Sequence, residues 1–301
     1  MRLEGFIHYV HTELMPGVEL YVYALKGERY SLLIDTGIAS MKPDILELCR
    51  EVGTPKYVLI SHAHADHIGC SGAVKAATGA HFAAAGALSW LEDYETHYRE
   101  FCRTDALPDS AAQRQEILGL MDTPVEIELL LSPNTSFRLA EDIELLTLAL
   151  PGHKLEEVGF LEVHTGTLFV ADVFLALAAP FFHGFQTAVG FYDSLRRLEA
   201  LITSGRVRRV VSSHHHPMDP EGTLAAIVAT RRFLDDVERA TLEAATGVPF
   251  KTLWQTVCGA LDKQQEFRGY AMLEVQVREL QAAGRLRQEG DRLFAMGVPR
   301  D

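Results

Sequence analysis

The feature that most constrains this chain is a cluster of three histidines and an aspartate directly after an apolar run. Residues 61–67 read Ser-His-Ala-His-Ala-Asp-His and follow the β-branched and aromatic segment KYVLI. In an extended segment, side chains two positions apart point the same way, so His62, His64 and Asp66 converge. A following turn brings His67 to a neighbouring point. Imidazoles and carboxylates suit zinc, iron or manganese, and the lack of cysteine ligands favours a hydrolytic over a structural zinc site.

Three further candidate ligands stand where an apolar run meets a loop. His153 follows LLTLAL in a Pro-Gly-His turn, Asp172 follows TLFVA, and His214 follows RVRRVVSS. At such positions a rigid sheet fixes the residue while the loop admits a ligand. A single histidine after a strand is more often a satisfied surface residue, so only the shared context of all the segments indicates a common site.

The order of apolar runs predicts a layered α/β protein. In the first half we expect a hairpin over 18–34, a helix over 43–52, an interior strand in KYVLIS and another in GAHFAAA. The second half repeats this theme, with strands in DIELLTLAL, VGFLEVHT, TLFVADVF and RVRRVVSS and a helix over 192–203. Two β-rich halves with helices outside predict a four-layer α/β/β/α sandwich.

The sequence also predicts a division into two domains. Residues 1–217 form the predicted catalytic domain, with a helical insertion at 88–131 where aromatic and acidic residues recur at helical spacing. Residues 218–301 form a mainly helical C-terminal domain. Its end reads as an amphipathic helix and a hairpin turning at Glu289–Gly290–Asp291, which is also a winged-helix-like pattern.

Composition limits the expected partners and compartment. The net charge of −13 argues against nucleic acid, whose binding requires Lys and Arg to neutralise phosphates. The N-terminal segment lacks the continuous apolar stretch of a signal peptide, and no later stretch spans a bilayer without charge. The four cysteines form no CxxC pair. We therefore expect a cytoplasmic protein that acts on a small molecule without a membrane, and a homodimer is compatible with the sequence.

These motifs resemble, in order and spacing, those of the metallo-β-lactamase superfamily. Asp-Thr-Gly at 35–37 also resembles a turn that this family places beside its metal site. The resemblance covers about residues 18–217 and implies the family's sandwich fold. The motifs are His62-x-His64-x-Asp66-His67, Ile68-Gly69, Pro-Gly-His at 151–153, Ala-Asp at 171–172 and Ser-His at 213–214.

The resemblance implies a centre of two divalent metal ions, zinc in the first place and iron or manganese as alternatives. A hydroxide shared by the ions would be the nucleophile. Asp66 would also relay a proton to the leaving group, and Asp35 would support the ligands from behind. The implied ligands are His62, His64 and His153 for the first ion, Asp66, His67 and His214 for the second, and Asp172 as the bridge.

Two positions depart from the family pattern. Ala171 stands where the family usually has a glycine before the bridging aspartate. In Ser-Ser-His-His-His-Pro, the preceding serine selects His214 as the last ligand, whereas Pro217 selects His215. We favour His214, and expect His215 and His216 to support the ligands or to lie at the surface.

Loops over the ligands are expected to select the substrate. We take residues 88–131 and 180–185 as the pocket walls, and His183 and Phe185 as candidate substrate contacts. Aromatic residues at helical spacing are more often packing residues, so these segments name no substrate.

The leading hypothesis is a metal-dependent hydrolase of a small ester, thioester or lactone. A phosphodiesterase or nuclease of the same fold is an alternative, because some members carry a helical or winged-helix-like C-terminal extension. An iron-dependent persulfide dioxygenase is another, whereas His64 argues against the flavodiiron pattern, which has glutamate there. A metal-binding sensor is the non-enzymatic alternative, and the filling of every ligand position counts against it.

Overall fold

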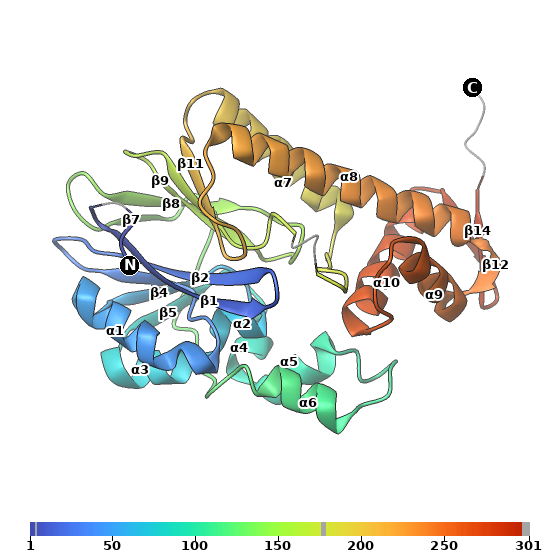
Figure 1. Ribbon diagram of the computed structural model, residues 1–301, viewed down its shortest axis with the longest axis horizontal. Helices are drawn as coiled ribbons and strands as arrows, with labels where there is room; N and C mark the ends of the chain where they lie inside the picture. The colour runs from blue at the N-terminus through green and yellow to red at the C-terminus, as the bar shows by residue number, and fades with distance from the viewer. Residues whose placement is uncertain (4, 176–178, 297–301) are drawn as a thin grey trace.

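Two β-sheets face each other and carry helices on their outer faces (Figure 1). The computed structural model describes residues 1–3, 5–175 and 179–296. The core between the sheets is apolar and includes Tyr23, Leu59, Phe160 and Phe169. The predicted four-layer α/β/β/α arrangement is therefore confirmed.

The first sheet is antiparallel on one side and parallel on the other. Its pairing of Tyr23 with Ile34 confirms the predicted hairpin, and the pairings beyond it are parallel. The outermost strand was not predicted, because IHYVHTELM mixes histidine and charge with apolar residues and lies at an edge. In the order in which they pair, the strands are β1 (Ile7–Met15), β2 (Val18–Leu25), β3 (Leu32–Ile34), β4 (Tyr57–Ile60), β5 (His81–Ala84) and β6 (Leu129–Leu130).

The second sheet is formed by the later half of the sandwich. The four apolar runs predicted as strands are all present in it, and two of them are buried along their whole length because helices cover their outer face. In pairing order the strands are β11 (Arg209–Ser212), β10 (Thr167–Val170), β9 (Val158–Glu162), β8 (Glu144–Ala149) and β7 (Ser136–Arg138).

Helices α1 (Lys42–Val52) and α3 (Ser71–Thr78) cover the first sheet, and α7 (Ala188–Thr203) and α8 (Pro220–Ala244) cover the second (Figure 1). Helix α1 matches the predicted helix and ends at Gly53, which adopts the left-handed conformation that glycine favours. Within the described residues, no helix combines the length and apolar character of a membrane span.

The predicted insertion at 88–131 is helical only in its first part. It contains α4 (Leu88–Glu92), α5 (Tyr94–Phe101) and α6 (Ala111–Leu118). The prediction of helix up to residue 131 is wrong at its end, because β6 pairs in parallel with β5 and extends the first sheet. This short run is too brief for an alternating pattern to distinguish it from a helix end.

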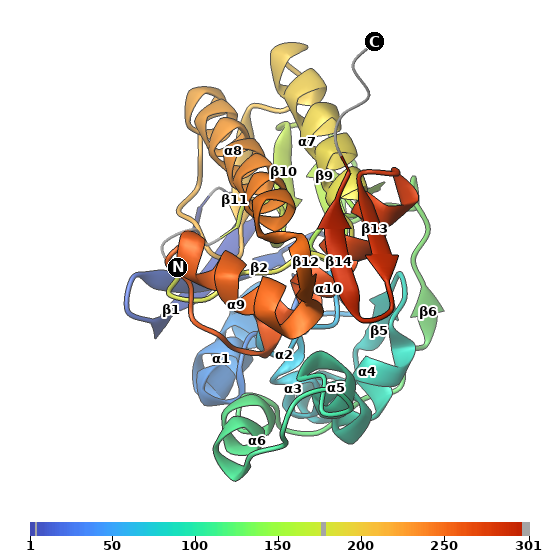
Figure 2. The ribbon, with the colours of Figure 1, turned by 90° about the vertical axis from the view of Figure 1, so that its right-hand side faces the viewer.

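The C-terminal region combines helices with a small sheet (Figure 2). Helices α9 (Phe250–Ala260) and α10 (Phe267–Ala282) precede the hairpin of β13 (Leu286–Glu289) and β14 (Arg292–Ala295). The predicted helix and hairpin are confirmed, and β12 (Thr246–Pro249) adds an unpredicted strand. The last residues of the predicted domain, 297–301, lie outside the described residues, and the division at residue 217 stays a prediction.

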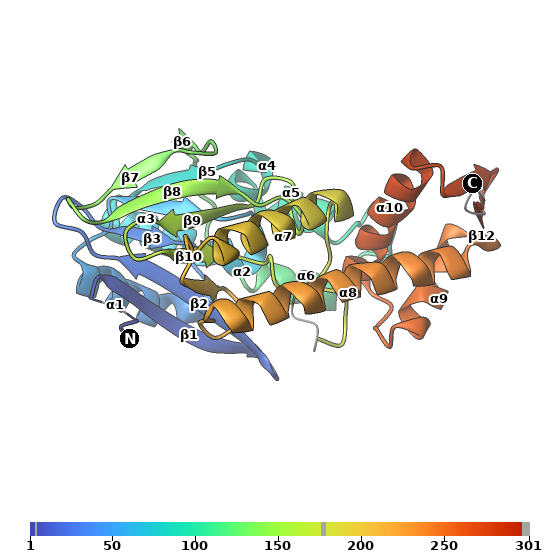
Figure 3. The ribbon, with the colours of Figure 1, turned by 90° about the horizontal axis from the view of Figure 1, so that it is seen from above.

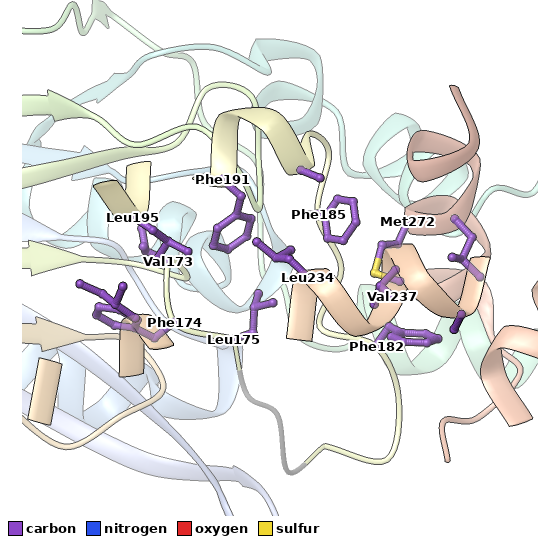
Figure 4. Close-up of a cluster of buried hydrophobic side chains, with 14 of the residues drawn as sticks. Val173, Phe174, Leu175, Phe182, Phe185, Phe191, Leu195, Leu234, Val237 and Met272 are labelled. Atoms are coloured by element: carbon purple, nitrogen blue, oxygen red, sulfur yellow. The ribbon is translucent and has the colours of Figure 1, made fainter. Parts of the chain in front are cut away.

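A continuous apolar core joins this region to the sandwich. Helix α8 extends from the second sheet to the C-terminal elements (Figure 3). Figure 4 shows Phe191 of α7, Leu234 and Val237 of α8 and Met272 of α10 within one buried cluster. Helix α10 is therefore held in a defined position relative to the loops of the sandwich.

Gly69 lies where two loops approach closely, and this gives the first prediction. A Cβ added there would lie 2.3 Å from the Leu120 carbonyl oxygen and 2.5 Å from that of Gly37. Because both neighbours are backbone atoms, Gly69→Ala is expected to lower the free energy of unfolding by about 1–3 kcal/mol. Urea denaturation measures this change.

The matched control is Gly259→Ala in α9, where an added Cβ meets nothing within 4 Å. There alanine is expected to stabilise the helix by up to about 1 kcal/mol. Equal stabilities of the two variants would contradict the close packing at Gly69.

Candidate metal centre

The predicted ligands from distant parts of the chain meet at one edge of the sandwich. His62 and His64 follow β4 directly, and α2 (Ala65–Ile68) then carries Asp66 and His67. The other three predicted ligands follow β8, β10 and β11, in the order His153, Asp172 and His214. The sheets thus fix each side chain at the end of a strand, as the sequence indicates.

The first group consists of His62, His64, His153 and Asp172, whose ligand atoms lie within 4.8 Å of one another. His64 Nδ1 is 3.1 Å from His62 Nε2 and 2.8 Å from His153 Nε2. His153 Nδ1 faces the Gly184 carbonyl oxygen at 2.9 Å and donates its proton there. The Nε2 lone pair of His153 is therefore directed into the group, as metal ligation requires.

The second group consists of Asp66, His67 and His214. His214 Nε2 lies 3.3 Å from Asp66 Oδ2, and His214 Nδ1 faces the Glu19 carbonyl oxygen at 2.7 Å. Asp172 reaches this group as well, since its Oδ1 is 3.4 Å from His67 Nε2. Its other oxygen is 3.4 Å from His153 Nε2. Asp172 therefore lies between the two groups.

Asp35 holds the second group from behind. Its carboxylate accepts hydrogen bonds from the Ser61 backbone N–H and hydroxyl, both at 2.7 Å, and from His67 Nδ1 at 2.9 Å. The aspartate has a φ of +59°, so the Asp-Thr-Gly turn places this carboxylate under the His67 ring through a strained backbone. The bond at Nδ1 directs the Nε2 atom of His67 toward Asp66 and Asp172.

Burial and charge set opposite protonation tendencies within the cluster. Burial holds the pKa of His62 and His64 well below the usual range, so both are neutral. Burial alone would also lower the pKa of His214, but Asp172 and Asp66 raise it to about 10. Although burial disfavours a charged Asp172, His214 and the other histidines lower the pKa of this carboxyl well below normal. His62 and His64 are thus neutral, whereas His214 is protonated beside the ionised carboxylate of Asp172.

The residues present fit divalent metal ions. Among the described residues, His67 Nε2 and Asp172 Oδ1 are buried and have no hydrogen-bond partner. Such atoms destabilise a fold unless something satisfies them, and both point into the cluster. Imidazole nitrogens and carboxylate oxygens are the donors that zinc, iron and manganese accept. The arrangement therefore suits metal ligation better than a hydrogen-bond network.

His183 lies closer to the cluster than the prediction of a substrate contact implied. Its Nε2 is 2.9 Å from Asp172 Oδ2, and it forms a third possible ligand group with Asp172 and His214. Phe185 is buried and lines the cavity above the cluster. Whether either residue contacts a substrate stays a prediction.

The structure brings His214, and not His215, into the cluster. His215 Nε2 lies 3.0 Å from the Phe174 carbonyl oxygen, and His216 Nδ1 lies 2.5 Å from the Tyr21 hydroxyl. Neither belongs to the ligand groups described above, so both lie beside the site. The serine alignment used in the sequence analysis agrees with this placement.

Glu157 supports the ligand Asp172, and the sequence did not indicate this role. It is fully buried, and its Oε1 accepts a hydrogen bond from the Asp172 backbone N–H at 2.9 Å. Burial and the nearby Asp172 raise its pKa well above the usual value. A glutamate before an apolar run carries no signal of this role, which depends on the pairing of β9 with β10.

A cavity of about 450 Å³ opens onto the cluster. Both predicted wall segments contribute, with Trp90 and Phe101 from the insertion and Phe181 and Phe185 from the later loop. Sequence reasoning missed the wall formed by α10. The sequence carried one signal for this wall, because the α10 residues that face the cavity recur three or four positions apart, as on one face of a helix. They are Arg268, Ala271, Met272, Val275 and Arg278.

The chain belongs to the metallo-beta-lactamase superfamily, whose family model matches residues 17–214. A search of curated proteins finds no match. Solved structures share the fold at low sequence identity. A metallo-beta-lactamase family protein from Thermus thermophilus has a TM-score of 0.76 and 18% identity, and the alignment covers 98% of this chain and 100% of that chain.

Two further structures show how far the likeness extends. A beta-lactamase domain protein from Burkholderia ambifaria has a TM-score of 0.73 and 14% identity over 98% of this chain and 93% of that chain. A metallo-beta-lactamase superfamily protein from Sulfolobus tokodaii has a TM-score of 0.57 and 17% identity, and covers 77% of this chain and 87% of that chain. The Thermus and Burkholderia structures therefore share the C-terminal elements as well as the sandwich.

The central position of Asp172 predicts a loss of metal on substitution. Purified wild-type protein is expected to hold about two divalent ions per chain, and Asp172→Ala about one or none. Elemental analysis after dialysis measures the metal content. Asp44→Ala, at an exposed carboxylate of α1, is the control and should keep the wild-type content. Full metal content in Asp172→Ala would refute the bridging role.

Asp35 supports His67 and is not itself a predicted ligand. Its substitution is therefore expected to weaken metal binding less than Asp172→Ala does. Asp35→Asn leaves one acceptor oxygen, which can face either the Ser61 backbone N–H or the Ser61 hydroxyl and His67, but not all three donors. Loss of such support is expected to weaken metal binding about 10- to 100-fold. Competition with a zinc chelator measures this affinity, and an unchanged value would show that the Asp35 contact is dispensable.

Proposed function

We propose that this chain is a metal-dependent hydrolase that uses two divalent ions to cleave an ester, thioester or lactone. The observation that carries the proposal is the placement of Asp172 between two ligand groups at the floor of an apolar cavity. Bound divalent ions lower the pKa of water to about 7 and polarise a carbonyl oxygen, which is the chemistry that such a reaction needs. Zinc is the proposed metal, with iron or manganese as alternatives.

The chain's own residues would orient the substrate and move a proton. Asp66 is partly exposed, with 18% of its side chain accessible to solvent, and it lines the cavity. The neighbouring His67 and His214 lower its pKa against the effect of burial, so it is ionised. Water would lose a proton to Asp66 and add to the carbonyl carbon, the C–O or C–S bond would break, and Asp66 would pass the proton to the leaving alcohol or thiol.

The cavity walls would exclude water from the reacting group. Trp90, Phe101, Phe181 and Phe185 come from different segments and surround the opening onto the cluster. Removing water strengthens electrostatic interactions at the reacting atoms. A cavity of about 450 Å³ accommodates a ligand much larger than acetate, so we propose a small-molecule substrate of moderate size.

A phosphodiesterase is the second candidate. The helix α10 and the following hairpin favour it, because they match the winged-helix-like pattern noted in the sequence. The net charge of −13 counts against a polyanionic substrate.

The cytoplasmic location and the homodimer stay predictions.

A substrate panel tests the proposed reaction. Zinc-loaded protein is expected to hydrolyse 4-nitrophenyl esters, acyl thioesters or acyl lactones at least about 100-fold faster than Asp172→Ala, because the ions supply several kcal/mol of barrier lowering. Faster turnover of bis(4-nitrophenyl) phosphate than of every carbonyl substrate would move the phosphodiesterase to first place. One iron per chain with oxygen consumption would instead identify a dioxygenase.

A further inference from the structure

The cavity above the cluster is lined on one side by a stripe of α10. Ala271, Met272 and Val275 lie on this face, between Arg268 and Arg278 at its two ends. Since a helix rises 1.5 Å per residue, the two arginines are about 15 Å apart along the axis. The apolar residues between them, from Ala271 to Val275, span about 6 Å of this length and suit a hydrocarbon segment rather than a small polar group.

Two of the arginines that line the cavity, Arg268 and Arg103, already form ion pairs with carboxylates. Arg268 pairs with Glu266 at 2.8 Å and with Glu116 at 3.2 Å, and packs against three phenylalanine rings. Arg103 pairs with Asp105 and Glu274. Neither guanidinium is therefore free to bind a further anion without losing its partners.

Arg278 differs from both of these arginines. It is exposed, it lines the cavity, and in the part of the chain that the structure describes it forms no ion pair. The acidic residue one turn before it on α10 is Glu274, which is bonded to Arg103. Glu274 is near enough to interact with the charge of Arg278, but this carboxylate is bonded to Arg103. A guanidinium that forms no ion pair at the end of an apolar wall is suited to bind an anionic group of a ligand.

We propose that the substrate is an ester or thioester with an apolar acyl chain that lies along α10 and ends in an anionic group bound by Arg278. This inference rests on the proposed function for the reacting end of the molecule. The other end is recognised by charge, so a carboxylate and a phosphate fulfil the same role. Ala271 and Val275, which are partly exposed, contact the chain between them.

Binding measurements test the anionic end without turnover. The probes are N-methyl dodecanamide and two analogues that carry a terminal carboxylate or phosphate at the far carbon, titrated calorimetrically into zinc-loaded protein. Each anionic probe is expected to bind about threefold to fivefold more tightly than the neutral one, the upper part of the range of an exposed ion pair. The stronger of the two identifies the anion.

Arg278→Gln is expected to remove this preference and to leave the neutral probe's affinity unchanged. The control is Arg232→Gln, an exposed arginine of α8 that is absent from the cavity wall and should keep the preference. A preference that survives in Arg278→Gln would show that the anion binds the metal centre instead and would overturn the proposal, as would equal binding of all probes by the wild type.

The apolar stripe is tested by acyl-chain length. For a homologous series of acyl thioesters, kcat/KM is expected to rise up to about fourfold per methylene until the chain fills the cavity. Val275→Phe should shorten the chain length at which the rise stops, and Val275→Ala should not; thermal melting checks that both variants fold. No dependence on chain length in the wild type would overturn the proposal.

The two hypotheses fail in different ways. If the amide probes bind with the expected preference but no ester, thioester or lactone is hydrolysed, the proposed reaction is wrong and the binding surface stands. If carbonyl substrates are hydrolysed with no preference for chain length or charge, the reaction stands and the role of α10 is wrong.

Discussion

The organisation of the site depends on one buried carboxylate, Asp172. Removing an ionised carboxylate from water is strongly unfavourable unless opposite charge and hydrogen bonds compensate for it. Here histidines from separate segments surround the group, and Glu157 holds the backbone of Asp172. The strand ends must therefore meet with little freedom, because a shift of any one would leave this charge without a partner.

The sandwich supplies that precision through its layers. The core between the sheets fixes β4 relative to β10, and the outer helices cover the remaining apolar faces. Residues at the strand ends then inherit the rigidity of the sheets. Their support comes from neighbouring segments, as with Asp35 beneath His67 and the Glu19 carbonyl oxygen behind His214. A rigid frame with local hydrogen bonds is a general way to hold ligands whose mutual repulsion would otherwise separate them.

Much of this arrangement could be predicted from the sequence. The interior strands are apolar along their length, and the histidine and aspartate motifs follow them directly, so both the sandwich and the clustering of candidate ligands were expected. The edge strands β1, β6, β7 and β12 were missed because they are short or carry mixed residues. Helix α10 was predicted as a helix, but its position over the cavity depends on contacts across the molecule. Glu157 was missed for the same reason, since only strand pairing brings it to Asp172.

Helix α8 belongs to both parts of the molecule, because it covers the second sheet and then carries the C-terminal elements (Figure 3). Each residue of a helix advances the chain by 1.5 Å and turns it by about 100°. Gain or loss of a single residue within α8 would rotate α9 and α10 around the molecule and turn the stripe of α10 away from the ligands. The length of α8 therefore cannot change by a single residue without moving α10. A helix that carries none of the predicted ligands thus determines the shape of the cavity above them.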